Sequence, residues 1–304
     1  MESRYSHPEE NGHEPVLLVD HLADTARRVE YVVPEEAQTP AGESLRDVVE
    51  TVAYLHDIGK ATTYFQQHIE MMDGEPDRPA YRYHAPMGAF ASYYALDAQG
   101  FDTETCLAGF VAVGRHHGEL PDIANYVFRR AYRREAVSSG NQNSAEQLQM
   151  AVSAQIEDID TQWSDRANTL FQKATRGKGS WDAFYDRFGA LLGEIASTVA
   201  TPSGKDMTRE PLSNSCYSLV LECWGSLVMA DKTSAASRSD AEQLPASAYR
   251  AKVPSMQRLD AAVRNLEEQS NADPDGTRTE RLNHHRSKAR EDVLENAKSF
   301  AVNG

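Results

Sequence analysis

The chain has 304 residues, which is enough for one large domain or two small ones around a sizeable core. Its formal net charge is -15 at pH 7, with an isoelectric point of about 5.1, so it should repel nucleic acid unless metal ions or a local basic patch hold the polyanion. Its three cysteines include no close Cys-x-x-Cys pair, which argues against a disulfide framework or a zinc knuckle and for a reducing compartment.

Helical spacing of apolar residues extends through most of the chain. Apolar positions recur every three or four residues, and no segment alternates convincingly as a strand would, so the predicted fold class is all-α. Gly59 is expected to end the second helix with a left-handed cap. The predicted helices cover residues 16–32, 45–56, 62–72, 85–98, 103–113, 145–159, 181–200 and 216–231.

The remaining C-terminal residues have a different character. Polar, charge-rich helices are predicted over residues 256–268 and 281–301, and they resemble a connector more than core helices. The longest apolar run, residues 217–230, is interrupted by Glu222 and is too short to span a bilayer. Because the first six residues also contain no apolar signal region, we expect a cytoplasmic protein without a membrane partner.

The balance of charges suggests an adaptation. The chain has 8 lysines against 23 arginines and a large excess of acidic residues. This pattern is typical of halophilic proteins, whose strongly hydrated carboxylates keep the surface soluble at high salt. An ordinary acidic cytosolic protein is the alternative interpretation.

The dipeptide His56-Asp57 lies in an otherwise apolar segment and is the strongest candidate for a metal site. A neutral imidazole beside a carboxylate suits first-row divalent metals, and a shared carboxylate with histidines on both sides can hold two ions. Asp57 is the natural bridge, because the preceding apolar helix should fix it in the core. A core pair that satisfies itself by hydrogen bonds is the alternative.

Five further residues could complete such a site. His21 shares a partly apolar helical face, His84 opens a helix, the doublet His116-His117 lies at a glycine-bounded helix end, and Asp231 follows an apolar run. A buried aspartate needs a partner, and adjacent histidines reach one site only near a helix end or bend. Each residue also has a structural alternative, such as a surface doublet or a hydrogen bond at the edge of the core.

Lys60 lies about one turn beyond the pair. Its ammonium could hold a non-bridging phosphate oxygen or a leaving group, which would give it a catalytic role beside Asp57. Alternatively, it could satisfy carbonyl groups at the end of the preceding helix.

A basic and aromatic segment follows the histidine doublet. Arginine with aromatic rings suits single-stranded nucleic acid, because guanidinium groups bind phosphates and rings stack on bases. A solvated face paired with the many carboxylates is the alternative. The candidate substrate-binding residues are Arg129, Arg130, Arg133 and Arg134.

These motifs together resemble the HD nuclease domain of the CRISPR-associated helicase–nuclease of type I interference systems. The resemblance covers residues 5–240 and is weak over residues 141–204, which look like a helical insertion. We therefore predict an HD domain over residues 1–245 and a helical connector over residues 246–304. The residues that carry the resemblance are 55–62 (Leu-His-Asp-Ile-Gly-Lys-Ala-Thr), Phe65-Gln66, 84–89, 115–121 and Ala230-Asp231.

The resemblance implies a helical nuclease that degrades single-stranded DNA with two divalent metal ions: manganese, nickel, cobalt or iron, with magnesium possible. It assigns His21, His56, Asp57 and Asp231 to one ion. It assigns Asp57, His84, His116 and His117 to the other. Lys60 matches the motif lysine of the family. The implied partners are a helicase, fused or separate, and a CRISPR RNA-guided surveillance complex.

The chain has no Gly-x-x-x-x-Gly-Lys-Ser/Thr phosphate loop, so it is not expected to hydrolyse ATP itself. Two other functions share some of these features. A nucleotide phosphohydrolase acting on dNTPs would use the same histidine–aspartate chemistry. A docking module with a decayed site would need only the acidic surface.

Overall fold

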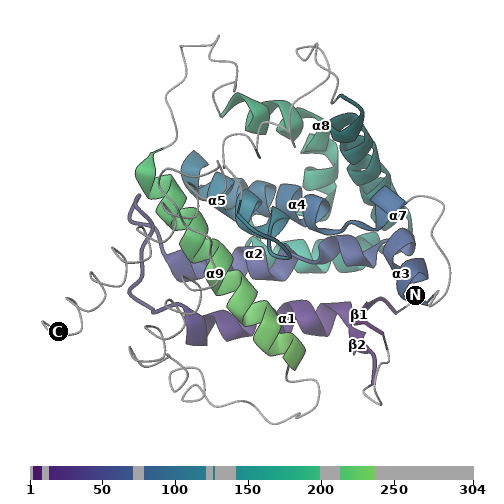
Figure 1. Cartoon of the computed structure of the whole chain (residues 1–304), viewed down its shortest axis with the longest axis horizontal. Helices are drawn as coiled ribbons and strands as arrows, with labels where there is room; N and C mark the ends of the chain where they lie inside the picture. The colour runs from purple at the N-terminus through teal and green to yellow at the C-terminus, as the bar shows by residue number, and fades with distance from the viewer. Residues whose placement is uncertain are drawn as a thin grey trace, which may run out of the picture. The chain divides into compact units, whose positions relative to one another are not determined.

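A computed structural model describes residues 3–8, 14–70, 79–120, 126, 142–198 and 213–236. The chain divides into two units, Met1–Gln243 and Leu244–Gly304, and the second lies outside the described residues. The predicted domain boundary and connector therefore stay predictions. In chain order the described helices of eight or more residues (Figure 1) are α1 (Leu18–Val32), α2 (Leu45–Leu55), α3 (Thr63–Glu70), α4 (Ala85–Gln99), α5 (Thr103–Gly114), α7 (Gln142–Ala174), α8 (Trp181–Ser197) and α9 (Asn214–Ala236).

Capping residues fix where several helices begin and end. The Ser44 hydroxyl accepts a hydrogen bond from the Asp47 amide at the start of α2. The Asp102 carboxylate accepts one from the Thr105 amide at the start of α5. At the end of α4, Gly100 takes a left-handed conformation with φ of 90°, so α4 and α5 are joined by a tight turn.

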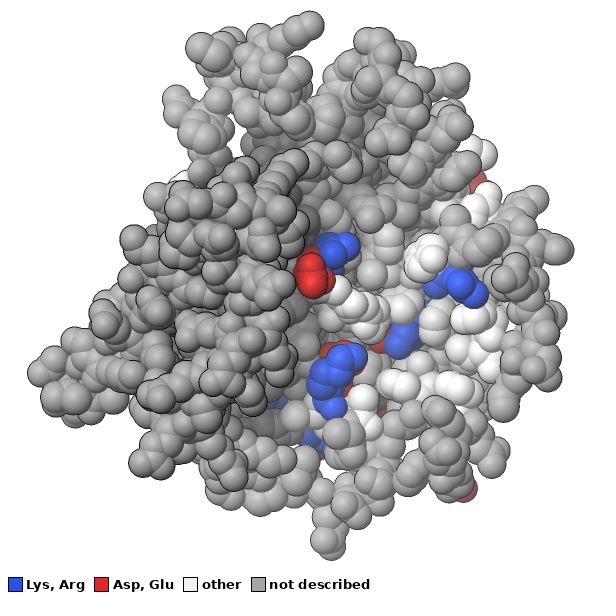
Figure 2. Space-filling view, viewed as in Figure 1, with Lys and Arg blue, Asp and Glu red and all other residues white. Residues whose placement is uncertain are grey.

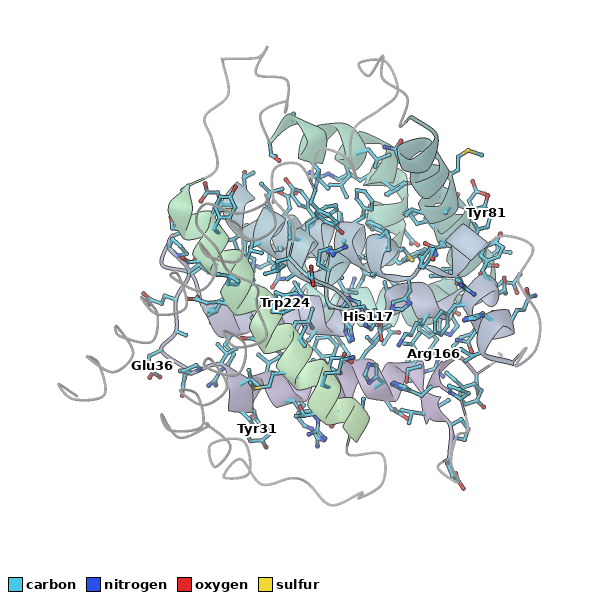
Figure 3. All side chains as sticks on the ribbon, in the orientation of Figure 1. Tyr31, Glu36, Tyr81, His117, Arg166 and Trp224 are labelled. Carbon is cyan, nitrogen blue, oxygen red and sulfur yellow. The ribbon has the colours of Figure 1, made fainter. Side chains whose placement is uncertain are left out.

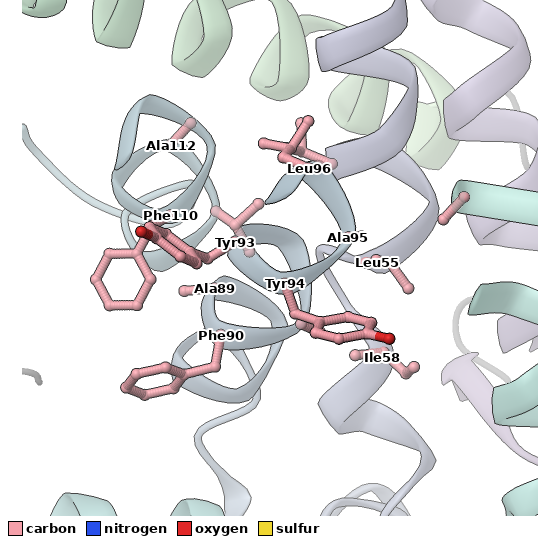
Figure 4. Packing of buried hydrophobic residues seen from close by; sticks show 14 of the residues in the cluster. Leu55, Ile58, Ala89, Phe90, Tyr93, Tyr94, Ala95, Leu96, Phe110 and Ala112 are labelled. Atoms are coloured by element: carbon pink, nitrogen blue, oxygen red, sulfur yellow. The ribbon is translucent and has the colours of Figure 1, made fainter. Parts of the chain in front are cut away.

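Helices α4 and α5 form the centre of the core. Every residue of α4 from Met87 to Leu96 is buried, and α5 is buried from Thr105 to Val113. Phe90 of α4 packs edge-on against Phe110 of α5 with ring centroids 5.1 Å apart (Figure 4). Helix α2 packs against α4, and α9 packs against α1, α2 and α5, crossing in front of α1 and α2 in Figure 1.

Helices α7 and α8 belong to the same core. Helix α7 packs against α2 and α4, and α8 packs against α4 and α7. The predicted helix 145–159 was too short, since α7 runs on to Ala174. Polar residues obscure the pattern in this half, but Trp163, Ala167 and Phe171 lie at helical spacing and are buried.

Two short strands correct the expectation that no strand is present. β1 (Tyr5–His7) pairs antiparallel with β2 (Val16–Leu17), so the helix predicted from residue 16 begins at Leu18. Strands of three and two residues are too short to show an alternating pattern. The fold class is nevertheless all-α, as predicted. Among the described residues, no helix combines the length and hydropathy needed to cross a membrane.

Candidate metal centre

The histidine–aspartate pair lies where α2 ends. Leu55 is the last residue of α2, and His56 keeps helical backbone angles. Asp57 has φ of −109° and ψ of 12° and leads into the short 3-10 helix η1 (Ile58–Ala61). Both residues are buried, and α4 packs against both α2 and η1 on either side of them.

Asp57 is shared between two groups of possible metal ligands. Its side chain is 1% exposed, and its Oδ1 lies 3.0 Å from Nε2 of His84 and 3.3 Å from Nε2 of His116. Its Oδ2 lies 3.4 Å from Nε2 of His21 and 3.5 Å from Nε2 of His56. Each carboxylate oxygen thus faces a different pair of imidazoles, which is the arrangement that a bridging carboxylate requires.

The first group joins α1, the end of α2 and α9. Nε2 of His21 lies 3.3 Å from Oδ1 of Asp231, and Nε2 of His56 lies 3.6 Å from the same oxygen. All four residues of the group, Asp57 included, are buried. Asp231 lies inside α9, because that helix continues past the predicted end at residue 231 to Ala236.

The second group joins Asp57 to residues at the ends of α4 and α5. His84 is the N-cap residue of α4, as the sequence predicted for a helix start, and His116 and His117 lie in the turn after α5. Nε2 of His84 lies 2.9 Å from Nε2 of His117. His117, which is labelled in Figure 3, is exposed, so this group has an open side. Within each group the possible ligand atoms lie within 4.8 Å of one another.

Backbone carbonyls fix the orientation of two of the buried rings. Nδ1 of His56 lies 2.8 Å from the carbonyl oxygen of Ala53, and Nδ1 of His116 lies 2.6 Å from that of Val113. Because a carbonyl only accepts, Nδ1 carries the proton of each neutral ring. The lone pair is then on Nε2, which points toward Asp57.

Two glycines allow the segments to approach closely, and sequence reasoning missed this role. A Cβ on Gly59 would lie 2.7 Å from the carbonyl oxygen of His84. A Cβ on Gly88 of α4 would clash with the carbonyl oxygen of His56, because the two atoms would be much closer than the 3.0 Å that real Cβ contacts keep. The prediction of a left-handed cap at Gly59 is wrong, because Gly59 lies in η1 without a positive φ.

Distant side chains anchor the backbone beside the two groups. Nε1 of Trp224 on α9 donates to the carbonyl of Arg115, next to the histidine doublet, at 3.0 Å (Figure 3). Nε2 of Gln155 on α7 donates to the carbonyl of Tyr83, next to His84, at 3.0 Å. Sequence analysis did not single out either residue, because their partners are far away in the chain.

Gln66 is an anchor within the sequence motif itself. Its Nε2 donates to the carbonyl of Lys60 at 2.7 Å and to that of Tyr5 at 2.8 Å, and its Oε1 accepts from the Tyr5 amide at 2.9 Å. Gln66 therefore ties strand β1 to the segment that carries Asp57.

Sequence comparisons with known proteins identify the family of this chain. A sequence profile described as Cas3, HD domain, matches residues 6–184. The chain belongs to this family. The protein named CRISPR-associated nuclease/helicase Cas3 from Haloferax volcanii is 31% identical over 242 residues, which are 76% of this chain and 24% of that relative. The chain therefore spans about a quarter of the length of that relative. No solved structure matches the chain.

In this Cas3 HD domain, the carboxylates of Asp57 and Asp231 are held in their charged form. Burial alone would raise the pKa of Asp57, but the Lys60 ammonium and the imidazoles of His56 and His84 hold it well below its usual value. Nζ of Lys60, which is 7% exposed, lies 2.6 Å from Oδ2 of Asp57. Burial would raise the pKa of Asp231, but the neighbouring imidazoles of His21 and His56 lower it.

The residues of the two groups fit divalent metal ions. Apart from the ion pair of Asp57 with Lys60, several buried atoms have no hydrogen-bond partner: Nε2 of His21, His56 and His116 and both oxygens of Asp57. Leaving one such atom unsatisfied costs about 1–3 kcal/mol, so their concentration at one point indicates a ligand. Imidazole nitrogen with carboxylate oxygen is the donor set of first-row transition metals.

The predicted site residues fall into two sets. The structure brings together His21, His56, Asp57, Lys60, His84, His116, His117 and Asp231. The arginines proposed to bind substrate lie outside the described residues; they are Arg129, Arg130, Arg133 and Arg134.

Proposed function

We propose that this chain is a metal-dependent nuclease that degrades single-stranded DNA in type I CRISPR interference. The observation that carries the proposal is the sharing of Asp57 between two groups of histidines and aspartates. The Cas3 HD family match supports the same reaction class. The reaction is hydrolysis of a phosphodiester bond.

In this proposal the two groups hold one ion each. Manganese, nickel, cobalt or iron suit their imidazole-rich donors, whereas magnesium prefers sites made mostly of oxygen. Two bound divalent ions would activate water and neutralise the negative charge that develops on the phosphoryl and leaving oxygens. Asp57 links the two groups, and the backbone bonds of His56 and His116 hold their Nε2 atoms in place.

Positive side chains near the groups would position the phosphate. Lys60 balances the charge of Asp57 and, in the proposal, contacts a non-bridging phosphate oxygen. Nζ of Lys232 lies 3.2 Å from Oδ2 of Asp231, and the Lys232 side chain is 60% exposed. Figure 2 shows described Lys and Arg side chains near the centre of the face that α9 crosses. In the proposal, these cations and the arginines of residues 129–134 attract DNA despite the net charge of -15.

The proposed partners follow from the relative. It is named as both a nuclease and a helicase, and most of its length lies beyond the part that matches this chain. We therefore propose that this domain works with a helicase, fused or separate, and with a CRISPR RNA-guided surveillance complex. A cytoplasmic location is part of this proposal, and the three cysteines, which are all free and buried, are compatible with a reducing compartment.

A metal-screened cleavage assay at high salt tests the function. With manganese or nickel, the protein is expected to degrade single-stranded DNA, to leave double-stranded DNA and dNTPs intact, and to lose activity when EDTA is added. At about 1 M salt the Debye length is about 3 Å, so direct bonds between metal and phosphate dominate binding. Turnover of dNTPs without DNA cleavage would instead identify a nucleotide phosphohydrolase, and failure to bind any of the metals would favour a docking module.

The pH dependence of metal binding should distinguish the two groups. Burial lowers the pKa of His21, but the nearby carboxylates of Asp231 and Asp57 reverse this and raise it above the usual 6.5. Burial lowers the pKa of His84 to about 4 and that of His117 to about 3. A protonated ring cannot bind a metal ion, so protons compete for the first group at a higher pH than for the second.

Titration calorimetry with manganese at pH 8, 7, 6 and 5 is expected to show two bound ions falling to one as the pH decreases. Circular dichroism at each pH would show that the protein is still folded. Simultaneous loss of both ions would contradict the prediction.

A further inference from the structure

His21 differs from the other buried histidines in how its second ring nitrogen is held. Nδ1 of His56 and of His116 bonds to a backbone carbonyl at a helix end. His21 lies inside α1, where the carbonyls are already engaged in the helix. Its Nδ1 instead faces the hydroxyl of Ser234 on α9, at 3.4 Å.

Ser234 has a second partner on α1. Its hydroxyl also bonds to the carboxylate of Asp24, which lies one turn after His21. Oδ2 of Asp24 receives a hydrogen bond from Nε of Arg28 at 2.6 Å, and its Oδ1 receives one from Arg27. Burial would raise the pKa of Asp24, but the bonds from Arg28, Ser234 and Arg27 lower it, so Asp24 is a carboxylate at neutral pH.

The charge of Asp24 sets the direction of both hydrogen bonds. A carboxylate only accepts, so the Ser234 hydroxyl donates its single proton to Asp24. The lone pairs of the Ser234 oxygen then accept from Nδ1–H of His21. With a proton held on Nδ1, the His21 ring can present the lone pair of Nε2 to a metal ion beside Asp57 and Asp231.

We propose that Asp24 and Ser234 are positioning residues that fix the tautomer and orientation of His21 for the metal ion of the first group. The inference rests on the proposed function of this site as a metal centre. Each helix supplies a ligand and its support one turn apart: α1 carries His21 and Asp24, and α9 carries Asp231 and Ser234. Partners of this kind typically change metal affinity by about 10- to 100-fold.

The test compares Ser234→Ala with Ser234→Thr in the full chain. Titration calorimetry with manganese at pH 8 is expected to show about 10- to 100-fold weaker binding of one ion in Ser234→Ala, with the other ion unchanged. Ser234→Thr keeps the hydroxyl and should restore most of the affinity. Thr233→Ala is the matched control, because the Thr233 hydroxyl donates to the carbonyl of Met229 within its own helix at 2.6 Å.

A second measurement does not depend on metal. Long-range ¹H–¹⁵N spectra of the metal-free protein at pH 8 are expected to show His21 protonated on Nδ1. In Ser234→Ala the neutral ring should shift toward the Nε2–H form, because Nε2 faces the carboxylates of Asp57 and Asp231. If Ser234→Ala fails to fold, Asp24→Asn replaces it in the experiment. This variant changes a more exposed residue and should shift the tautomer in the same sense. Absence of metal binding by the wild-type protein would defeat the proposed function. Two ions bound with unchanged affinity by Ser234→Ala, or an unchanged His21 tautomer, would overturn the inference alone.

Discussion

Replacement of Asp57 by alanine is expected to abolish metal binding at both groups and to reduce DNA cleavage to background. Asp57 is the one residue shared by the two groups, and each of its oxygens faces a different pair of imidazoles. Loss of any other ligand removes one donor from one group only. Calorimetry with manganese and a gel assay on single-stranded DNA would measure the two effects, and intact cleavage by this variant would refute the bridging role.

The same substitution should also affect stability, which needs a control. Removal of Asp57 leaves the Lys60 ammonium buried without its carboxylate, at a cost of about 3–5 kcal/mol in the free energy of unfolding. The double variant Asp57→Ala, Lys60→Met removes the unpaired charge and should recover most of that loss in urea unfolding. It should still bind no metal, so recovered cleavage in the double variant would count against the metal centre.

Replacement of Gly88 by alanine should have the second largest effect. The new Cβ would collide with the carbonyl oxygen of His56, and the backbone of neither α4 nor α2 can move without disturbing the core. We expect a loss of about 1–3 kcal/mol or more in the free energy of unfolding, together with weaker metal binding by His56. Thermal unfolding and manganese titration would measure these effects.

Gly225 of α9 provides the matched control. It is also a glycine within a helix, but no atom lies within 4 Å of the position that its Cβ would take. Gly225→Ala should therefore stabilise the protein by up to about 1 kcal/mol through helix propensity alone, with metal binding unchanged. Equal destabilisation by both substitutions would show that the crossing at His56 has no special role.

The sequence predicted the parts of the site that depend on local pattern. His56-Asp57 and His116-His117 are adjacent pairs at helix ends, and helical spacing of apolar residues indicates which helices carry them inward. The helices themselves were also largely predictable, since α1, α2, α4 and α5 agree with the predicted ranges to within two residues at either end.

The parts that the sequence did not reveal depend on contacts between distant segments. Nothing in the local pattern shows that Gln155 bonds beside His84, or that Trp224 bonds beside His116. The role of Gly88 depends on where α4 crosses α2, which only the tertiary packing decides. For the same reason the left-handed conformation predicted at Gly59 was wrong, because a glycine can be required by a neighbouring backbone as well as by its own φ angle.

The dependence of the first group on α9 has a consequence for biosynthesis. Asp57, His84, His116 and His117 have all left the ribosome well before α9 is made, whereas Ser234 follows His21 by 213 residues. A nascent chain can therefore assemble the second group early but must wait for nearly the whole helical domain before the first can close. If the proposed metal centre is the active site, a polypeptide stalled before residue 231 would lack Asp231 and could not complete the first group.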